Sequence, residues 1–155
     1  MLQAALGSAH GVRAVVAGRG TLAGELEQLA ASGTPGQVEL PGFVDDDTVV
    51  DLYARSLGVV YAPLDEDYGY ATLQAFLSGK PVITATDSGG VLEFVEDGVT
   101  GYVTDGSPEQ LAAAADRLAA DPEHAAAMGA EGRRRVEAWD WPAVVERLVA
   151  GAGGA

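Results

Sequence analysis

The chain has 155 residues, 48% of them hydrophobic and 21% charged, which fits one globular domain rather than a disordered segment. Its 23 acidic and 9 basic residues give a formal net charge of −14, which argues against binding to nucleic acid or to an anionic membrane surface, since both require a basic face. Cysteine is absent, which excludes disulfides and thiolate metal sites. With no apolar run of membrane length and no signal peptide, we expect a soluble, cytoplasmic domain.

The acidity has two possible explanations. Lys80 is the only lysine and asparagine is absent, whereas alanine and glycine are abundant. Such a bias is typical of a GC-rich genome, and a surface dense in carboxylates is also an adaptation to high salt. Composition does not separate the two.

In the first half of the chain, short apolar runs alternate with amphipathic segments, which predicts a parallel α/β sheet. The expected elements are a buried strand at Val12–Ala17, a helix at Thr21–Ala31, a short strand at Val38–Leu40 closed by Pro41-Gly42, a helix at Asp45–Arg55 and a strand at Gly58–Ala62.

The second half continues the same alternation. It predicts a loop at Pro63–Tyr68, a helix at Gly69–Ser78, a strand at Val82–Ala85, a short helix at Gly89–Val95, a strand at Gly101–Val103, a helix at Ser107–Ala120 capped by Ser107, a helix from Pro122 and a last helix after Asp140. We expect the Gly151–Ala155 tail to be disordered, because it has nothing to pack.

The order of elements at the start is unusual. A doubly wound domain normally opens with a strand, whereas this chain opens with Leu2–Leu6, which resembles the end of a helix. We therefore expect the first strand and its loop to be missing and the chain to be a fragment of a longer protein. The alternative is a small, complete flavodoxin-like domain.

Ligands of open parallel sheets bind beyond the carboxyl ends of the strands. Four predicted loops meet this condition: Gly18–Thr21, Pro41–Asp45, Pro63–Gly69 and Ala85–Val91. Candidate site residues are therefore sought there.

The first of these loops matches a dinucleotide fingerprint. Gly18-Arg19-Gly20 begins a G-x-G-x-x-A pattern between a strand and a helix, and Glu39 follows about twenty residues later. This indicates NAD binding, but Pro41-Gly42 interrupts the chain just after the acid, and a tight turn for close backbone approach explains the glycines equally.

The loop Asp87–Glu93 contains Gly89 and Gly90 at a strand-to-helix junction. Backbone N–H groups there can hold a phosphate, aided by the helix dipole. The alternative is an ordinary turn in which Asp87 or Ser88 caps the helix.

The loop Pro63–Gly69 is rich in acids and stands before a helix. A carboxylate at that place, such as Glu66, can accept hydrogen bonds from sugar hydroxyls. Gln74, eight residues later, falls within the helix. An inward-facing Gln74 requires a polar partner, whereas an outward-facing one does not.

These motifs together closely resemble the donor-binding half of group 1 glycosyltransferases, the family-four group of GT-B enzymes, which are retaining and use nucleotide-sugar donors. The resemblance runs from about Val12 to Trp139-Asp140-Trp141 and rests on Glu66-Asp67-Tyr68-Gly69 with Gln74, Gly79-Lys80-Pro81-Val82-Ile83, Gly89-Gly90 with Glu93, and Asp97-Gly98-Val99-Thr100-Gly101-Tyr102-Val103.

The resemblance implies a role for Glu66 as the catalytic residue, since it matches the first acid of the family's E-x7-E motif and contacts the donor sugar, with Tyr68 and Gly69 beside it. Gln74 stands at the second position, usually a Glu that binds the ribose hydroxyls. An amide keeps an acceptor but loses the charge-assisted part of that contact, about 1 kcal/mol.

By the same resemblance, backbone groups contact the rest of the donor. The diphosphate is expected at Gly18, Gly20, Ser88, Gly89 and Gly90, and the base beside Gly42, Phe43 and Val44. The family's first glycine turn thus replaces the NAD interpretation of Gly18 and Gly20.

The resemblance implies that residues 1–150 form the donor-binding domain of a two-domain enzyme. The donor is a co-substrate, and no metal or other cofactor is expected. The acceptor domain and the family's diphosphate-neutralising Arg and Lys would precede this chain, so it is not expected to be active alone. A non-catalytic scaffold or regulatory module, suggested by Gln74, and an NAD-binding Rossmann domain remain alternatives.

Overall fold

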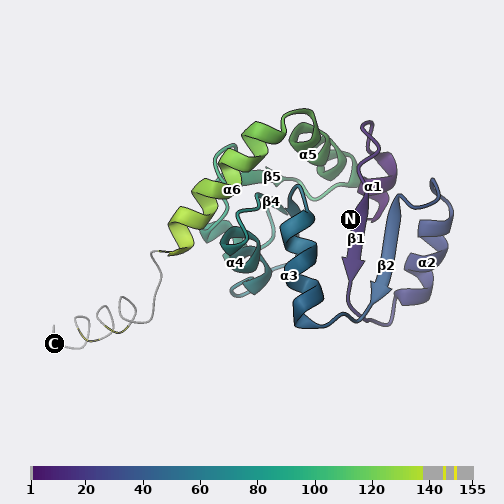
Figure 1. The fold of residues 1–155 in the computed structure, drawn as a ribbon, viewed down its shortest axis with the longest axis horizontal. Coiled ribbons are helices and arrows are strands. Elements are labelled where there is room, and N and C mark those ends of the chain that lie inside the picture. The colour runs from purple at the N-terminus through teal and green to yellow at the C-terminus, as the bar shows by residue number, and fades with distance from the viewer. Residues whose placement is uncertain (1, 138–144, 146–148, 150–155) are drawn as a thin grey trace.

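The computed structural model describes residues 2–137, 145 and 149. Figure 1 shows the element order, which is α1 (Leu2–Gly7), β1 (Ala14–Ala17), α2 (Ala23–Ala31), β2 (Val38–Gly42), α3 (Asp46–Arg55), β3 (Val59–Val60), α4 (Tyr70–Leu77), β4 (Val82–Ala85), the 3-10 helix η1 (Gly90–Glu93), β5 (Gly101–Thr104), α5 (Pro108–Ala120) and α6 (Pro122–Glu137). Within the described ranges, no helix combines the length and the apolar character needed to cross a bilayer. Apart from Val145 and Val149, the helix predicted after Asp140 lies outside them, as does the tail.

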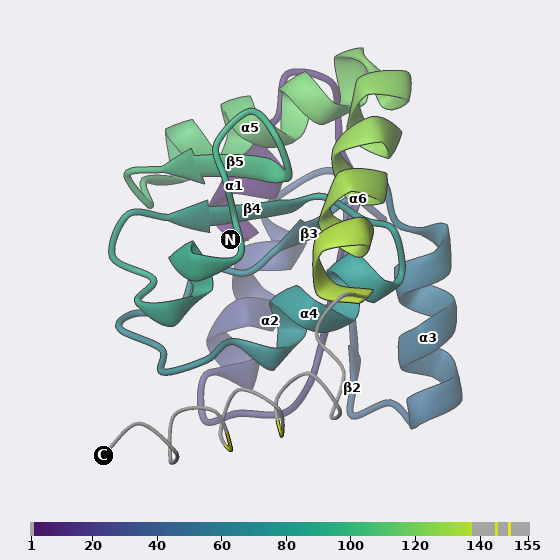
Figure 2. The same cartoon turned by 90° about the vertical axis from the view of Figure 1, so that its left-hand side faces the viewer.

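The strands form two separate parallel sheets. One contains β1 and β2, and the other has the order β3-β4-β5. Figure 2 shows β4 and β5 running side by side, with α5 along one face of their sheet and α4 with α6 along the other. The prediction of parallel α/β architecture with helices on both faces is therefore confirmed.

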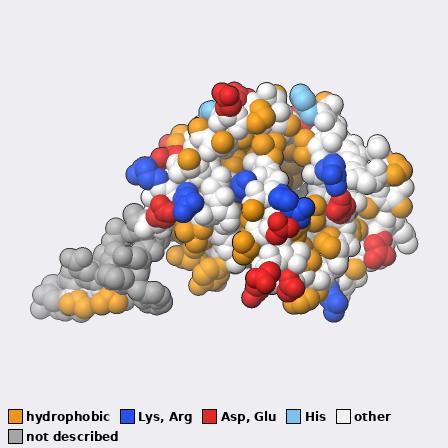
Figure 3. All heavy atoms as spheres, in the orientation of Figure 1, with side chains coloured by type: hydrophobic (Ala, Val, Ile, Leu, Met, Phe, Trp, Pro, Cys, Tyr) orange, Lys and Arg blue, Asp and Glu red, His pale blue; other side chains and the backbone are white. Residues whose placement is uncertain are grey.

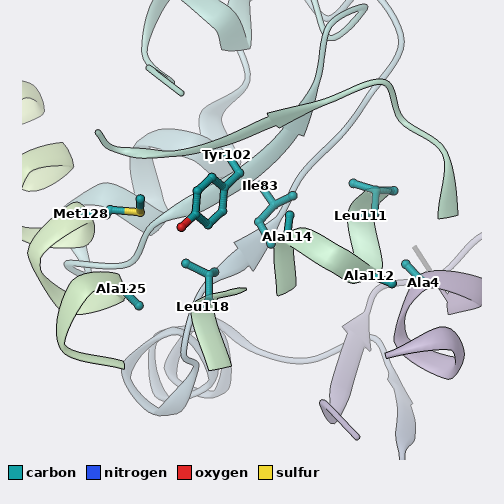
Figure 4. Close-up of a cluster of buried hydrophobic side chains, with 9 residues drawn as sticks. All are labelled: Ala4, Ile83, Tyr102, Leu111, Ala112, Ala114, Leu118, Ala125 and Met128. Atoms are coloured by element: carbon teal, nitrogen blue, oxygen red, sulfur yellow. The ribbon is translucent and has the colours of Figure 1, made fainter. Parts of the chain in front are cut away.

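The core occupies both faces of the β3-β4-β5 sheet because side chains alternate along each strand. Ile83 of β4 points into a cluster with Tyr102, Leu111, Leu118 and Met128 (Figure 4). The preceding residue, Val82, points to the opposite face and packs in a second cluster. That cluster is formed by Ala75, Phe76, Val82, Val91, Phe94, Val95 and Val136.

The first half of the chain has no comparable core. No residue between Leu6 and Tyr68 is fully buried. The prediction of a buried strand at Val12–Ala17 is therefore wrong: β1 alternates between half-buried and exposed residues, and Val15 is 43% exposed. The physical reason is that β1 has a strand on one side only, β2.

Several boundaries also differ from the expected ones. The second strand continues through Pro41 to Gly42, because Gly42 pairs with Ala17 of β1. The strand expected at Gly58–Ala62 shrinks to Val59–Val60, and α2 begins at Ala23 after a turn. The Ser107 cap is confirmed, since its hydroxyl accepts a hydrogen bond from the Gln110 N–H at 3.3 Å.

The short helix α1 links the two halves. It packs against α5 and also lies against α2 and β2. The Asp116 carboxylate of α5 accepts hydrogen bonds from the Ser8 hydroxyl and from the Ala9 and His10 N–H groups, which fixes the loop between α1 and β1.

Candidate functional site

Two loops meet at the carboxyl ends of β3 and β4. The Asp65 N–H donates to the Asp87 carbonyl at 2.8 Å, and the Gly90 N–H donates to the Glu66 carbonyl at 2.8 Å. Glu66 and Gly89 also form an isolated parallel bridge. The acid-rich loop and the glycine turn, 23 residues apart by the numbering of that pair, are thus one structural unit.

Glycine makes this contact possible. A Cβ atom on Gly89 would lie 2.6 Å from the Glu66 carbonyl oxygen, and one on Gly90 would lie 2.2 Å from the Asp67 carbonyl oxygen. Both distances are too short for any side chain. The two glycines therefore serve the approach of the loops, and the Gly90 N–H is already used by Glu66.

Ser88, expected at the diphosphate, is fully buried. Its N–H donates to the Ala85 carbonyl at 3.1 Å, and its hydroxyl accepts from the Ala85 N–H at 3.2 Å. It therefore stabilises the turn from within. The helix after it is a single 3-10 turn, Gly90–Glu93, with no side-chain cap, so neither Asp87 nor Ser88 caps it and its dipole is small.

Glu66 is partly buried, and its carboxylate accepts a hydrogen bond from the Tyr61 hydroxyl at 3.3 Å. Tyr61 comes from the chain just after β3. Burial raises the pKa of Tyr61 above its usual 10.0, and the nearby negative charge of Glu66 adds to that rise. The pair holds the proton on Tyr61 and fixes the direction of the Glu66 carboxylate.

Gln74 lies on the exposed face of α4. Its side-chain oxygen, Oε1, accepts a hydrogen bond from the Tyr53 hydroxyl of α3 at 3.3 Å, and burial raises the pKa of Tyr53. This bond uses only the side-chain oxygen, so the two N–H donors of the Gln74 amide are not part of it. Gln74 thus faces outward, one of the two orientations considered from the sequence.

Aromatic rings flank Glu66 on its carboxyl-terminal side. The Tyr68 ring lies 5.2 Å from that of Tyr70 and 5.4 Å, edge to face, from that of Phe94. Tyr70 is 72% exposed, whereas Gly69 between the tyrosines is buried. Tyr68 and Tyr70 thus form an aromatic pair that follows Glu66 in the chain.

The remaining predicted residues form a second group on the other sheet. The Gly18 N–H donates to the Gly42 carbonyl at 2.7 Å, which joins the two glycine loops. Phe43 is 68% exposed, and the Arg19 guanidinium lies 5.7 Å from the centre of its ring. Gly20 is exposed and Val44 is half-buried in the same loops.

In the described part of the chain, no hydrogen bond or ion pair joins the Gly18–Gly42 group to the Glu66 group. The acid of the dinucleotide fingerprint, Glu39, is paired with Arg13, the residue just before β1. Among the described residues no group of three or more His, Asp or Glu side chains is placed to hold a metal.

Sequence reasoning missed the two tyrosines. Tyr61 lies five residues before Glu66 and Tyr53 lies 21 before Gln74. No spacing pattern links either pair, because one contact depends on the conformation of the loop between β3 and α4 and the other on the packing of α3 beside α4. The sequence offered one signal, for Tyr61 only: it carries a hydroxyl and stands directly after a strand, just before the acidic loop.

Comparison with known proteins places this geometry in a family. The family model described as glycosyl transferases group 1 matches residues 2–135. The chain is 38% identical over 78 residues to the alpha-1,3/1,6-mannosyltransferase ALG2 of Dictyostelium discoideum, covering 50% of this chain and 18% of that protein. It is 35% identical over 148 residues to a GDP-mannose-dependent alpha-(1-6)-phosphatidylinositol monomannoside mannosyltransferase of Mycobacterium tuberculosis, covering 89% of this chain and 38% of that protein.

Solved structures show the same fold. The C-terminal domain of a group 1 glycosyl transferase (LpcC) from Francisella tularensis has a TM-score of 0.75 and 27% identity, covering 88% of this chain and 75% of that one. Anabaena HepE in complex with UDP and glucose has a TM-score of 0.83 and 24% identity, covering 99% and 44%. These likenesses confirm the expected Rossmann-like C-terminal half of a GT-B fold. This chain spans well under half the length of the curated relatives named above, and it belongs to the group 1 glycosyl transferase family.

Proposed function

We propose that this chain is the donor-binding domain of a retaining glycosyltransferase, which moves a sugar from a nucleotide-diphosphate donor to a hydroxyl acceptor. The observation that carries the proposal is the joining of the Pro63–Gly69 loop to the Asp87–Gly90 turn at the carboxyl ends of adjacent strands. This is where parallel sheets bind their ligands, and it gives Glu66 a fixed direction at the site.

The relatives support a nucleotide sugar as the donor. Two of them are named as mannosyltransferases, one of them GDP-mannose-dependent, and HepE was solved with UDP and glucose. The base and the sugar used by this chain do not follow from those names. Either nucleotide sugar is a suitable probe.

In the proposed complex, Glu66 accepts hydrogen bonds from the donor sugar and Gln74 contacts the ribose. The Gly89 N–H and the Gly18–Gly20 loop face the diphosphate, and the Gly42–Val44 loop flanks the base. Ser88 supports the turn rather than touching the donor, since it is buried. The donor is a co-substrate in this scheme, with no resident metal or cofactor, and the reaction takes place in the cytoplasm after an acceptor domain joins this one.

A binding experiment tests the proposal directly. Titration of the chain with GDP-mannose, UDP-glucose and NADH, followed by NMR chemical shifts, is expected to show saturable shifts at Glu66 and Gly89 for a nucleotide sugar and none for NADH. Saturable binding of NADH alone at Gly18 and Gly20 would contradict the proposal and support the dinucleotide fingerprint.

A matched pair of variants separates the contact with the donor sugar from the contacts with the nucleotide diphosphate. Glu66→Ala is expected to weaken nucleotide-sugar binding about tenfold, the loss of one charged hydrogen bond, while binding of the free nucleotide diphosphate stays unchanged. The control is Asp67→Ala, one residue along and exposed, which is expected to change neither. Equal weakening for both ligands would show that Glu66 does not contact the sugar.

A second function remains open because of one substitution. Gln74 stands where the family usually has Glu, and its Oε1 already accepts from Tyr53. A domain that kept the fold without turnover would be a scaffold or regulatory module. Gln74→Glu is expected to leave nucleotide binding equal or tighter in a donor-binding domain, and to have no effect on a scaffold that binds no donor.

A further inference from the structure

Tyr53 and Gln74 join two neighbouring helices. Tyr53 lies in the last turn of α3 and Gln74 in the middle of α4, and Figures 1 and 2 show the two helices side by side. The Tyr53 hydroxyl donates to Gln74 Oε1 at 3.3 Å. The Tyr53 ring packs against the buried cluster that contains Phe76, so the core holds the hydroxyl in place.

The end of α3 that carries Tyr53 is anchored a second time. The last carbonyls of a helix have no partner within it, and the Lys80 ammonium donates to the carbonyl of Ala54 at 2.9 Å. Lys80 stands in the turn after α4, where its own N–H donates to the Ala75 carbonyl at 2.9 Å. Two adjacent residues of α3 are therefore bonded to α4 and to the turn that ends it.

The charges of α3 follow the helix dipole. Asp46 and Asp47 lie in its first turn and Arg55 lies in its last. In Figure 3, acidic side chains gather where this helix begins, at the bottom of the view, and basic side chains lie toward its other end. Negative charge near the start of a helix and positive charge near its end both stabilise it. The end of α3 that carries Tyr53 is thus stabilised by its own sequence as well as by Lys80.

The bond to Tyr53 decides what Gln74 offers to a ligand. A primary amide has one oxygen that accepts hydrogen bonds and two N–H groups that donate them. Because Tyr53 is bonded to the oxygen, the exposed Gln74 side chain presents its N–H groups. Burial raises the pKa of Tyr53, so the phenol keeps its proton and stays the donor of this bond. A glutamate at the same place would instead present a second acceptor.

A second tyrosine holds Glu66 in the same way. The Tyr61 hydroxyl donates to the Glu66 carboxylate at 3.3 Å, and its ring packs against the same buried cluster as that of Tyr53. The pKa of Tyr61 is raised by burial, by Glu66 and, least of these, by Tyr53, so the two phenols are near enough to interact. Glu66 and Gln74 are thus each bonded through an oxygen to one of two neighbouring phenols.

We propose that Tyr53 is a positioning residue of the donor site, which holds the Gln74 oxygen so that position 74 donates hydrogen bonds to the nucleotide rather than accepting them. The inference rests on the proposed function, which supplies the contact between Gln74 and the ribose. A ribose hydroxyl both donates and accepts, so it pairs with an amide N–H as well as with a carboxylate oxygen, and only the direction of the bond changes. The same donor then suits either residue at position 74.

A double-mutant cycle tests the positioning role. Tyr53→Phe keeps the ring and removes the hydroxyl, and it is expected to weaken binding of GDP-mannose or UDP-glucose about threefold, as the loss of one ordinary hydrogen bond does. In the Gln74→Ala background it is expected to have no further effect, because it acts through Gln74. An equal effect in both backgrounds would overturn the proposal, since Tyr53 would then act on the fold.

The matched control for the lost hydroxyl is Tyr102→Phe. Tyr102 belongs to the buried cluster on the opposite face of the β3-β4-β5 sheet from the one that Tyr53 contacts. This variant is expected to leave binding of the nucleotide sugar unchanged. A threefold loss here as well would mean that the effect of Tyr53→Phe does not report on Gln74.

Ribose methyl ethers test the direction of the bond. A hydroxyl donates and accepts, whereas its methyl ether only accepts, and a carboxylate has no proton to give it. With the nucleotide diphosphate methylated on either ribose hydroxyl, Gln74→Glu is expected to discriminate against one of the two ethers at least about tenfold more strongly than the native chain does. Equal discrimination by the two chains, for both ethers, would overturn the proposal.

A readout without nucleotide separates this inference from the proposed function. In the free, isotopically labelled chain, Tyr53→Phe is expected to lower the heteronuclear NOE of the Gln74 side-chain amide and to leave that of the exposed Gln110 unchanged. An unchanged NOE at Gln74 would show that Tyr53 does not hold it. Failure of the native chain to bind any nucleotide sugar would instead contradict the proposed function, and with it a role of the pair in a donor site.

Discussion

At the scale of single residues, the contact between Tyr61 and Glu66 is the most direct support for a prepared site. The tyrosine hydroxyl donates to the carboxylate at 3.3 Å, and the pKa of Tyr61 is raised first by burial and then by the Glu66 charge. Both effects favour the protonated phenol, because the phenolate would be desolvated and repelled.

We therefore expect Glu66→Gln to lower the pKa of Tyr61 while leaving it above 10.0, since burial remains when the charge is gone. An NMR titration of tyrosine ring carbons in the labelled chain measures this. An unchanged Tyr61 would mean that the two side chains are not in contact in solution.

Replacing either of two buried threonines on neighbouring strands is expected to change the stability in opposite directions. In the described structure the Thr84 hydroxyl has no hydrogen-bond partner, whereas the Thr104 hydroxyl donates to the Thr84 carbonyl at 2.9 Å and accepts from the Gly106 N–H at 3.2 Å. A buried polar group without a partner lowers stability, and one that loses its partners leaves them unsatisfied.

Thr84→Val is accordingly expected to raise the free energy of unfolding by about 1 kcal/mol, and Thr104→Val to lower it by about 1–3 kcal/mol. Urea denaturation of the two variants measures both. A loss of stability in Thr84→Val equal to that in Thr104→Val would show that the Thr84 hydroxyl is bonded.

Part of the site could be predicted at this scale and part could not. Glu66 and the two glycines were chosen as candidates because they stand in loops at strand ends, a local property of the sequence, and their contacts with a donor stay predictions. Tyr53 was missed because its bond joins α3 to α4, and Tyr61 was missed because its bond depends on the conformation of the loop between β3 and α4. Ser88 was expected at the donor but is buried, because the sequence does not tell which side of a turn faces the core.

At the scale of secondary-structure elements, the sequence predicts best where local chemistry sets the boundary. The α3 and α5 helices begin after Asp45 and Ser107, whose side chains accept from Thr48 and Gln110 N–H groups. The strands were predicted less well. Gly42 extends β2 and the fifth residue of the expected third strand, Ala62, is not in a strand, because strand length depends on the neighbour that pairs with it.

The packing of α6 gives a prediction at the same scale. Gly129 is buried where α6 crosses the turn before β4, and a Cβ atom there would lie 2.0 Å from the Gly79 carbonyl oxygen. A methyl group would push the helix off the turn. Gly129→Ala is expected to lower the free energy of unfolding by about 1–3 kcal/mol, as overpacking of a core does, measured by urea denaturation.

The matched control is Gly24→Ala on α2. No heavy atom lies within 4 Å of the added methyl there, and alanine favours a helix over glycine by up to about 1 kcal/mol. This variant is expected to be neutral or more stable. If Gly129→Ala also left the free energy of unfolding unchanged, α6 would not pack against the turn before β4.

At the scale of the whole molecule, the overall architecture was predictable, but the uneven distribution of buried residues between its two sheets was not. The alternation of strands and helices predicts a parallel α/β fold. From the sequence alone, however, β1 is expected to be as deeply buried as β4. The fully buried side chains gather around β4 and β5, with Leu2, Ala4 and Ala5 of α1 added. Burial depends on how many neighbours a strand has, which a local pattern does not encode.

The net charge of −14 is also a property of the whole chain. The ion pairs of Arg13 and Arg55 do little to offset it locally, because they are largely exposed and such pairs contribute little stability. The excess carboxylates repel one another in the compact state. Salt is therefore expected to stabilise the protein by screening.

We expect the melting temperature to rise by several degrees between about 0.01 and 0.15 M KCl, as the Debye length falls from about 30 Å to about 8 Å, and then to level off. Calorimetry measures this. The control replaces the exposed Glu27 and Glu109 by lysine, and a smaller salt effect is expected there because the net charge is reduced. A rise that continues beyond about 1 M would exceed screening and favour adaptation to high salt over genome bias as the origin of the acidity. No rise in either protein would show that repulsion among the carboxylates does not limit stability.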